Sequence, residues 1–206
     1  MTALLAGLIV FAVALVVGVA LRPSLLATPA GRLLAFVALF LIPGLVTLGA
    51  TSLHLEHSKR TEFCLSCHEV EAYGQSLGVD DPTSLPAAHY QNGRVPREAA
   101  CYACHTQYTM YGDLRAKLAG LRHLGVHYFG AERRPGEIRL YEPYQNRECL
   151  HCHDAARSFV EGASHGALLA QLRSGELSCL QCHTVVHDVA RVAEKPRWQP
   201  PEGEGP

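Results

Sequence analysis

The sequence lacks a strong net charge and has no cysteine outside one recurring pattern. Its 18 basic and 19 acidic residues leave a formal net charge of -1, so no global field favours nucleic acid or an anionic surface. Long periodic apolar runs are few between residues 61 and 190, which leaves little material for a conventional apolar core. A chain of 206 residues is too short for two large soluble domains and suits one modest domain plus an anchor.

The eight cysteines could indicate a disulfide framework or zinc sites, but each belongs to a Cys-x-x-Cys pair followed directly by histidine. Two thiols at this spacing reach the two vinyl groups of one porphyrin, and the adjacent imidazole turns onto the iron. Four such motifs predict four covalently bound haem c groups. The predicted thioether residues are Cys64, Cys67, Cys101, Cys104, Cys149, Cys152, Cys179 and Cys182, and the predicted proximal ligands are His68, His105, His153 and His183.

Two apolar segments precede the motifs. Residues 4–21 carry no charge and residues 33–53 repeat this character, so each can cross a bilayer core as a transmembrane helix. The first segment lacks a positive start and an evident cleavage site, which favours an anchor over a signal peptide. Arg22 and Arg32 flank the connector and favour its cytoplasmic placement. Both outer ends then face the periplasm, where haem c is attached, so we expect a bacterial inner-membrane protein.

The expected fold is mainly α with much irregular structure. We predict a membrane anchor over residues 1–53, a periplasmic tetrahaem domain over 54–190 and a Pro/Gly-rich tail over 191–206. One longer helix is predicted over residues 111–126, where leucines recur at spacings of three and four. The haems must supply much of the interior, and residues 195–206 should be extended or disordered unless a partner holds them.

Eight histidines remain after the proximal ligands are assigned, and they are the candidates for the opposite side of each iron. His151 lies inside a motif and is discounted. For any single member of this set, a surface or packing role is the alternative. The others are His54, His57, His89, His123, His127, His165 and His187.

From Thr61 onward the chain resembles the NapC/NirT/NrfH family of membrane-anchored tetrahaem quinol dehydrogenases. The matching pieces are the Thr61-Glu62-Phe63 lead-in with CLSCH, His89-Tyr90 before the second motif, Arg147-Glu148 before the third, and His165 and His187 around the fourth. The resemblance covers about 130 residues. The family usually has one N-terminal helix, so the additional apolar segment is a departure.

The resemblance implies that membrane quinol gives electrons to the first haem, which passes them along the others to a periplasmic reductase or cytochrome. It implies His89 as ligand of the fourth haem and His187 of the third. His165 is the candidate for the second haem, with His127 as its competitor. Relatives often carry Met two residues after the first proximal histidine, where this chain has Val70. The alternatives for the sixth position of the first haem are an open site or a ligand from His127, His54 or His57.

Lys117 matches a lysine that relatives place near the first haem and the quinol. A lysine can hydrogen-bond a quinol oxygen, and His123 can accept a proton near neutral pH, although six residues of helix separate their faces by about 120°. An ordinary solvated lysine is the alternative for Lys117. The alternative function is an electron-relay subunit of a larger membrane complex, docked through the hairpin and the tail, with quinone handled elsewhere. Catalysis on a small molecule at an open haem is a weaker third reading.

Overall fold

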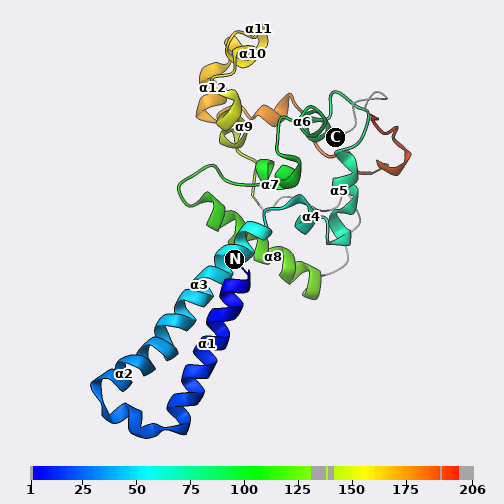
Figure 1. The fold of residues 1–206 in the computed structure, drawn as a ribbon. Helices are drawn as coiled ribbons and strands as arrows, with labels where there is room; N and C mark the ends of the chain where they lie inside the picture. Colours follow the sequence, from blue (N-terminus) through cyan, green and yellow to red (C-terminus); the bar gives the residue numbers. More distant parts are fainter. Residues whose placement is uncertain (1, 131–137, 139–141, 191, 200–206) are drawn as a thin grey trace. The chain divides into compact units, whose positions relative to one another are not determined.

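The computed structural model describes residues 2–130, 138, 142–190 and 192–199, and the chain is built of helices joined by turns and irregular segments (Figure 1). Within these residues there is no strand, and a single isolated bridge pairs Val79 with Arg197. The predicted mainly α fold is therefore confirmed. The chain divides into two compact units, Met1–Ser58 and Lys59–Pro206. This division lies five residues beyond the predicted end of the anchor.

The first unit is a helical hairpin (Figure 1). Helix α1 covers Thr2–Leu21, a 3₁₀ turn covers Pro23–Ala27, and the returning helix consists of α2 (Pro29–Phe36), a π-helical stretch (Val37–Leu41) and α3 (Ile42–His57). The spans Ala3–Leu21 and Pro29–His57 are both long and apolar enough to cross a membrane. Their bounds include both predicted segments, 4–21 and 33–53.

Small residues allow the two helices of the hairpin to approach closely. Ala12 and Ala38 are among the few buried side chains, and a Cβ atom added to Gly49 would lie 3.1 Å from Leu5 of α1. The wide π-helical stretch ends just before Pro43, whose ring cannot share a regular turn with the carbonyl four residues earlier. Most leucine and phenylalanine side chains of the hairpin point outward, as expected for helices surrounded by lipid.

The second unit contains short helices and one long one. Helix α8 (Gly112–Phe129) matches the helix predicted over 111–126 and extends three residues further. The other α-helices are α4 (Thr61–Cys64), α5 (Glu71–Ser76), α6 (Leu85–Gln91), α7 (Ala100–Cys104), α9 (Asn146–His153), α10 (Arg157–Val160), α11 (Ala163–Gly166) and α12 (Leu169–Ser174). The 3₁₀ turns are η3 (His68–Val70), η4 (Arg97–Ala99), η5 (Cys179–Gln181) and η6 (Val192–Glu194).

Apolar burial in the second unit is sparse. Its main cluster contains only Val79, Ala87 and Val192, with Ala72 packed against it. The four leucines of α8 are half exposed or more, so this predicted apolar face is not covered by the described part of the chain. Such a small interior is far from what a soluble domain of this length normally assembles. The polypeptide therefore depends on something besides its own side chains to hold the motifs together.

The beginning of the predicted tail runs in an extended path along the end of α5. The backbone N–H of Trp198 donates to the Gly78 carbonyl (3.0 Å), and the N–H of Asp80 donates to the Pro196 carbonyl (2.9 Å). Arg197 also hydrogen-bonds the Gln75 carbonyl. Residues 195–199 are therefore held by this chain itself. The remainder of the predicted tail, 200–206, lies outside the described residues.

Candidate functional site

The four Cys-x-x-Cys-His motifs lie on short helical turns. The first follows α4, the second occupies α7, the third ends α9 and the fourth begins at η5. All eight cysteines lie within the described residues, and no disulfide joins any two of them. Among those residues, no group of three or more histidine, cysteine or acidic side chains converges as a metal cluster of the zinc type would require.

The cysteines of consecutive motifs lie close enough to influence one another. A hydrogen bond from Cys101 is the main cause that lowers the pKa of the Cys64 thiol to about 7. Burial opposes this shift, and the positive charge of Lys117 adds to it. Burial raises the pKa of the Cys104 thiol, and Cys152 of the third motif raises it further. Burial, followed by the nearby Cys179, raises the pKa of Cys149 to about 12. The motifs therefore follow one another in space in their order along the chain.

Three polar side chains join these neighbours. The Thr61 hydroxyl donates to the Arg97 carbonyl (2.8 Å) and accepts from the Ala100 N–H (2.9 Å), which links the first motif to the second. The Tyr144 hydroxyl donates to the Cys104 carbonyl (2.6 Å), linking the second to the segment before the third.

Asn146, buried at the start of α9, links the third motif to the fourth. Its amide donates to the carbonyls of Leu172 (2.8 Å) and Leu177 (2.6 Å) and accepts from the Cys179 N–H (2.9 Å). No motif pattern in the sequence marks Asn146 or Tyr144. Thr61 could be singled out from the sequence, because it belongs to the Thr61-Glu62-Phe63 segment that precedes the first motif.

Each proximal histidine faces one of the predicted distal histidines. An iron atom between two imidazoles, with metal–nitrogen bonds of about 2.0 Å, separates the ring centres by about 6 Å. The four observed separations agree with this value. They are 5.9 Å for His68–His127, 6.1 Å for His105–His187, 5.9 Å for His153–His89 and 6.1 Å for His183–His165.

These pairs differ from the assignments implied by the resemblance. His89 lies opposite His153 of the third motif rather than on the fourth, and His187 lies opposite His105 of the second rather than on the third. His165 lies opposite His183 of the fourth motif, not on the second. The reason is the folding of the chain: α6 and the segment after η5 each approach a motif that is not adjacent in sequence.

Hydrogen bonds fix the orientation of three of the four opposing imidazoles. The Nδ1 atom of His89 donates to the Leu85 carbonyl (2.7 Å), and that of His127 donates to the Glu69 carboxylate. The Ser76 hydroxyl gives its proton to the Tyr73 carbonyl (2.6 Å), so it accepts from His187 Nδ1 (2.7 Å). Each ring then presents an unprotonated Nε2, the form that binds metal.

Burial keeps the second histidine pair neutral. It lowers the pKa of His105, and it lowers the pKa of His187 to about 4. Neutral imidazoles are the ligands that haem iron requires. The arrangement of thiols and imidazoles therefore fits covalently attached haem.

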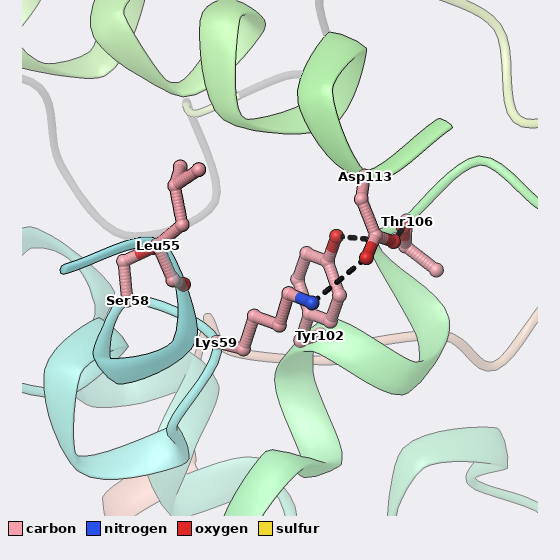
Figure 2. A network of polar contacts seen from close by, with 6 residues as sticks. All are labelled: Leu55, Ser58, Lys59, Tyr102, Thr106 and Asp113. Carbon is pink, nitrogen blue, oxygen red and sulfur yellow. Dashed lines mark hydrogen bonds and ion pairs between the residues drawn. The ribbon is translucent and has the colours of Figure 1, made fainter. Parts of the chain in front are cut away.

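Lys117 lies close enough to the first motif for its charge to act on Cys64. Its ammonium sits 4.3 Å from the centroid of the Tyr102 ring, a cation–π contact. Figure 2 shows Tyr102 and Lys59 both reaching Asp113: the hydroxyl donates to Oδ1 (2.8 Å) and the ammonium to Oδ2 (2.7 Å). The hydrogen bonds from Lys59 and then Tyr102 lower the pKa of Asp113. Asp113 precedes Lys117 by four residues, one helical turn, in α8.

Lys117 and His123 act on different motifs: the charge of Lys117 acts on Cys64 of the first motif. His123 lies near His105 of the second motif, whose pKa it lowers in addition to the effect of burial. Desolvation also lowers the pKa of His123 itself. His151 stacks on Tyr108 with 3.7 Å between ring centroids, and His54 and His57 belong to the last turn of α3.

Known proteins with similar sequences were compared with this chain. A Cytochrome c-type protein NapC of Haemophilus influenzae is 25% identical over 161 residues, which cover 71% of this chain and 76% of that protein. The NapC of Escherichia coli K12 is 24% identical over 189 residues, covering 84% and 88%. A protein of Allochromatium vinosum named as a tetraheme cytochrome-c type is 24% identical over 165 residues, covering 71% and 83%. No solved structure matches.

The family model for the N-terminal region of the NapC/NirT cytochrome c family matches residues 29–192. This match includes α2, α3 and all four motifs, and it starts after α1. It accords with the Cys-x-x-Cys-His motifs and the facing imidazoles. The chain therefore belongs to the NapC/NirT cytochrome c family, as a membrane-anchored electron-transfer protein with covalently bound haem.

Proposed function

We propose that this protein oxidises membrane quinol beside its first haem and passes the electrons through four covalently bound haems to a periplasmic redox protein. The observation that carries the proposal is the set of four facing histidine pairs, each with ring centres 5.9 or 6.1 Å apart. The mutual influence of cysteines in consecutive motifs supports a single path from the first motif to the fourth.

The axial ligands follow from these pairs. We assign His187 to the haem of the second motif, His89 to that of the third and His165 to that of the fourth. When bound, each haem accepts one electron and returns it at a potential set by its axial ligands. The hydrogen bonds to Leu85 and Ser76 orient the rings of His89 and His187 toward the iron.

Lys117 is the residue that we assign to quinol. Oxidation of a quinol to a quinone releases two electrons and two protons, and an ammonium can hold a quinol oxygen while negative charge develops on it. The Tyr102 ring holds this ammonium from one side, and the charge of Lys117 acts on Cys64, where the first haem is attached. His123 faces the second motif, so the assignment of the quinol contact rests on Lys117.

The orientation in the membrane follows from Arg22 and Arg32, which flank the connector between the two spans and favour its cytoplasmic location. The haem-binding unit then lies in the periplasm of a bacterial inner membrane. Its electrons would leave to a soluble reductase or cytochrome there. Labelling of introduced single cysteines on either side of the membrane would establish the orientation.

The test is reduction of the detergent-solubilised full-length protein by a short-chain quinol analogue. Mass measurement should first show four haem adducts. We expect the quinol to reduce the haems with the characteristic sharpening of the visible bands. A protein whose four haems are reduced by dithionite but not by any quinol analogue would contradict direct quinol oxidation.

The second candidate is an electron-relay subunit of a larger membrane complex. Helix α1 favours it, because the family match begins only at residue 29 and leaves α1 as a possible docking element. A relay would accept electrons only in the presence of its partner subunits. Purification of the untagged native protein with its companions, followed by the same quinol assay, separates these two functions.

A further inference from the structure

Helix α8 has an apolar face that the described part of the chain leaves uncovered. Its four leucines, Leu114, Leu118, Leu121 and Leu124, are between 50% and 59% exposed. We propose that α8 lies on the surface of the membrane at the end of the second span, with this leucine face in the lipid and Arg122 against anionic phosphate headgroups. The inference requires only that the hairpin spans the membrane, and it does not depend on quinol oxidation.

The leucine face is turned away from the histidines of the same helix. At about 3.6 residues per turn the four leucines span an arc of about 120°, and the midpoint of His123 and His127 lies about 145° from the centre of that arc. Both histidines approach haem motifs: His127 faces His68 with 5.9 Å between ring centroids, and His123 lies near His105. Haem attached to these motifs therefore lies on the histidine side of α8, and the leucines require a different covering.

Positive charge borders the leucine face along both of its edges. Lys117 lies at one edge and Arg122 at the other, about 140° apart around the helix. Arg115 lies on the same side as Arg122, where its guanidinium pairs with Glu142 (3.5 Å). Cations on long flexible stems beside an apolar face are typical of helices that lie in the interface of a membrane with anionic lipid. This charge pattern favours a lipid surface over an apolar protein surface as the covering.

Large exposed side chains occur at both ends of the helix. Met110 and Tyr111 come directly before α8 and are 88% and 72% exposed, and Tyr128 and Phe129 end it at 70% and 91%. A tyrosine ring is favoured at the level of lipid headgroups, where its body meets apolar chains and its hydroxyl meets water. Exposed apolar side chains in this number contribute to binding at a membrane surface, whereas in water they favour aggregation.

The chain holds the start of α8 within reach of the membrane boundary. The second span ends at His57, and Lys59 follows two residues later, at most about 7 Å along the chain. The Lys59 ammonium pairs with Asp113, in the first turn of α8, at 2.7 Å (Figure 2). The covalent connection and this ion pair together keep the first turn of α8 close to the point where the chain leaves the lipid.

A membrane-bound α8 gives a short route between the bilayer and the first motif. Lys117 lies at the edge of the leucine face, and its charge acts on Cys64. An apolar molecule dissolved in the bilayer can therefore meet this ammonium without leaving the lipid.

The test uses the full-length haem-loaded protein in nanodiscs of phosphatidylglycerol and phosphatidylcholine that contain a phospholipid with a diazirine in its acyl chain. Irradiation, proteolysis and mass spectrometry then identify the peptides that carry lipid adducts. We expect adducts on α8 as well as on the two spans, which are the internal reference. The peptide with Trp198, a side chain 38% exposed elsewhere in the unit, is the control and should stay unlabelled. Absence of adducts on α8, or equal labelling of the Trp198 peptide, would overturn the proposal.

Substitutions separate the apolar and the electrostatic contributions. Leu118→Glu with Leu121→Glu should reduce the adducts on α8 at least about ten-fold relative to those on the spans, because carboxylates are costly in lipid. Arg122→Gln should reduce them in the anionic nanodiscs but not in phosphatidylcholine alone. Arg157→Gln, which removes an exposed cation of α10, is the matched control and should change neither. Undiminished labelling of α8 in the double variant would contradict insertion of the leucine face.

A second copy of this chain or another protein would be a different covering for the leucine face. Benzoylphenylalanine in place of Leu118 captures, in native membranes, whichever group lies against this position. Lipid adducts support the proposal, whereas a crosslinked dimer or an adduct with another protein would overturn it.

The quinol assay is read separately from the lipid labelling. If lipid labels α8 but quinol fails to reduce the protein, the proposed function is wrong and the membrane contact stands. If quinol reduces a protein whose α8 is not labelled, the membrane contact is wrong and the proposed function stands.

Discussion

Tyr102 has two roles in the network beside the first motif. Its ring contacts the ammonium of Lys117, and its hydroxyl donates to Asp113, the partner of Lys59. Burial raises the pKa of Tyr102, so its hydroxyl stays a proton donor to Asp113. Asp113 has a lowered pKa and two donors, which makes it a positioning group and a poor acceptor for quinol protons.

We predict that Lys117→Ala slows quinol-driven haem reduction at least about ten-fold, equivalent to roughly 1.4 kcal/mol in the barrier, while dithionite reduction is unchanged. Stopped-flow absorbance measures both. Tyr102→Leu should produce a smaller loss because the ammonium is no longer held, and Tyr102→Phe should retain most of the rate because the ring remains. Arg115→Ala, an exposed cation on the same helix, is the control. Equal rates in Lys117→Ala and wild type would favour the relay function.

The sequence was sufficient to name the residues of the histidine pairs but not to pair them. Cys-x-x-Cys-His fixes the proximal ligand because thiols and imidazole act on one porphyrin within five residues. His89, His127, His165 and His187 were all singled out, and all four face a motif histidine. Which motif each one faces depends on the path of α6, α8 and the later segments. Order along the chain carries no information about that path.

At the scale of elements, α8 shows that apolar periodicity predicts the presence and the start of a helix better than its end. Leucines at spacings of three and four predicted the helix within one residue at its start, but its end lies at Phe129 rather than 126. Helix ends depend on capping, and the helix ends before Gly130, which lies four residues beyond Val126, the last aliphatic residue of the predicted segment. The network of Lys59, Tyr102 and Asp113 was not predicted, because it joins residues up to 54 positions apart.

Gly112 makes the start of α8 possible. A Cβ atom at this position would lie 1.5 Å from the Gln107 carbonyl oxygen, a backbone atom that cannot move without opening the preceding turn. Gly112→Ala should therefore lower the free energy of unfolding by about 2 kcal/mol or more, measured by thermal melting followed by circular dichroism. Gly120→Ala is the control: a Cβ there meets nothing within 4 Å, and the substitution should stabilise the helix by about 0.5–1 kcal/mol. A neutral Gly112→Ala would contradict the tight turn.

Asn146 is the element-scale connection between the third and fourth motifs. Asn146→Ala removes three hydrogen bonds at a buried position and leaves the Leu172 and Leu177 carbonyls without this donor. We expect a loss of about 2–4 kcal/mol and faster proteolysis after α9. The control is Asn92→Ala, whose amide makes one exposed hydrogen bond to Ala88. Limited proteolysis with mass mapping measures both, and similar cleavage in the two variants would count against this role for Asn146.

At the scale of the whole molecule, the polypeptide exposes far more surface than its mass predicts. Its accessible surface is 14659 Å², whereas a compact monomer of 22.4 kDa has about 9,400 Å². Exposed side chains of the membrane hairpin and the sparse interior of the second unit both contribute to the excess. The sequence indicated this, because four motifs occur in a segment with few apolar runs. The hydrogen bonds that Thr61, Tyr144 and Asn146 make between motifs could not be predicted from local sequence patterns, because they join residues far apart in the chain.

If electrons pass through the haems in the order of their motifs, loss of the third haem and loss of the fourth haem should affect stability and electron transfer differently. Cys149→Ser with Cys152→Ser removes the attachment of the third haem, and these cysteines lie near those of both the second and the fourth motif. Cys179→Ser with Cys182→Ser removes only the last member. We expect the inner variant to be the more sensitive to proteolysis, because two junctions lose their common support. We also expect it to hold its fourth haem oxidised for longer after quinol is added. Haem-stained gels, mass measurement and stopped-flow spectra test this, and equal defects in the two variants would mean that the haems do not act in the order of their motifs.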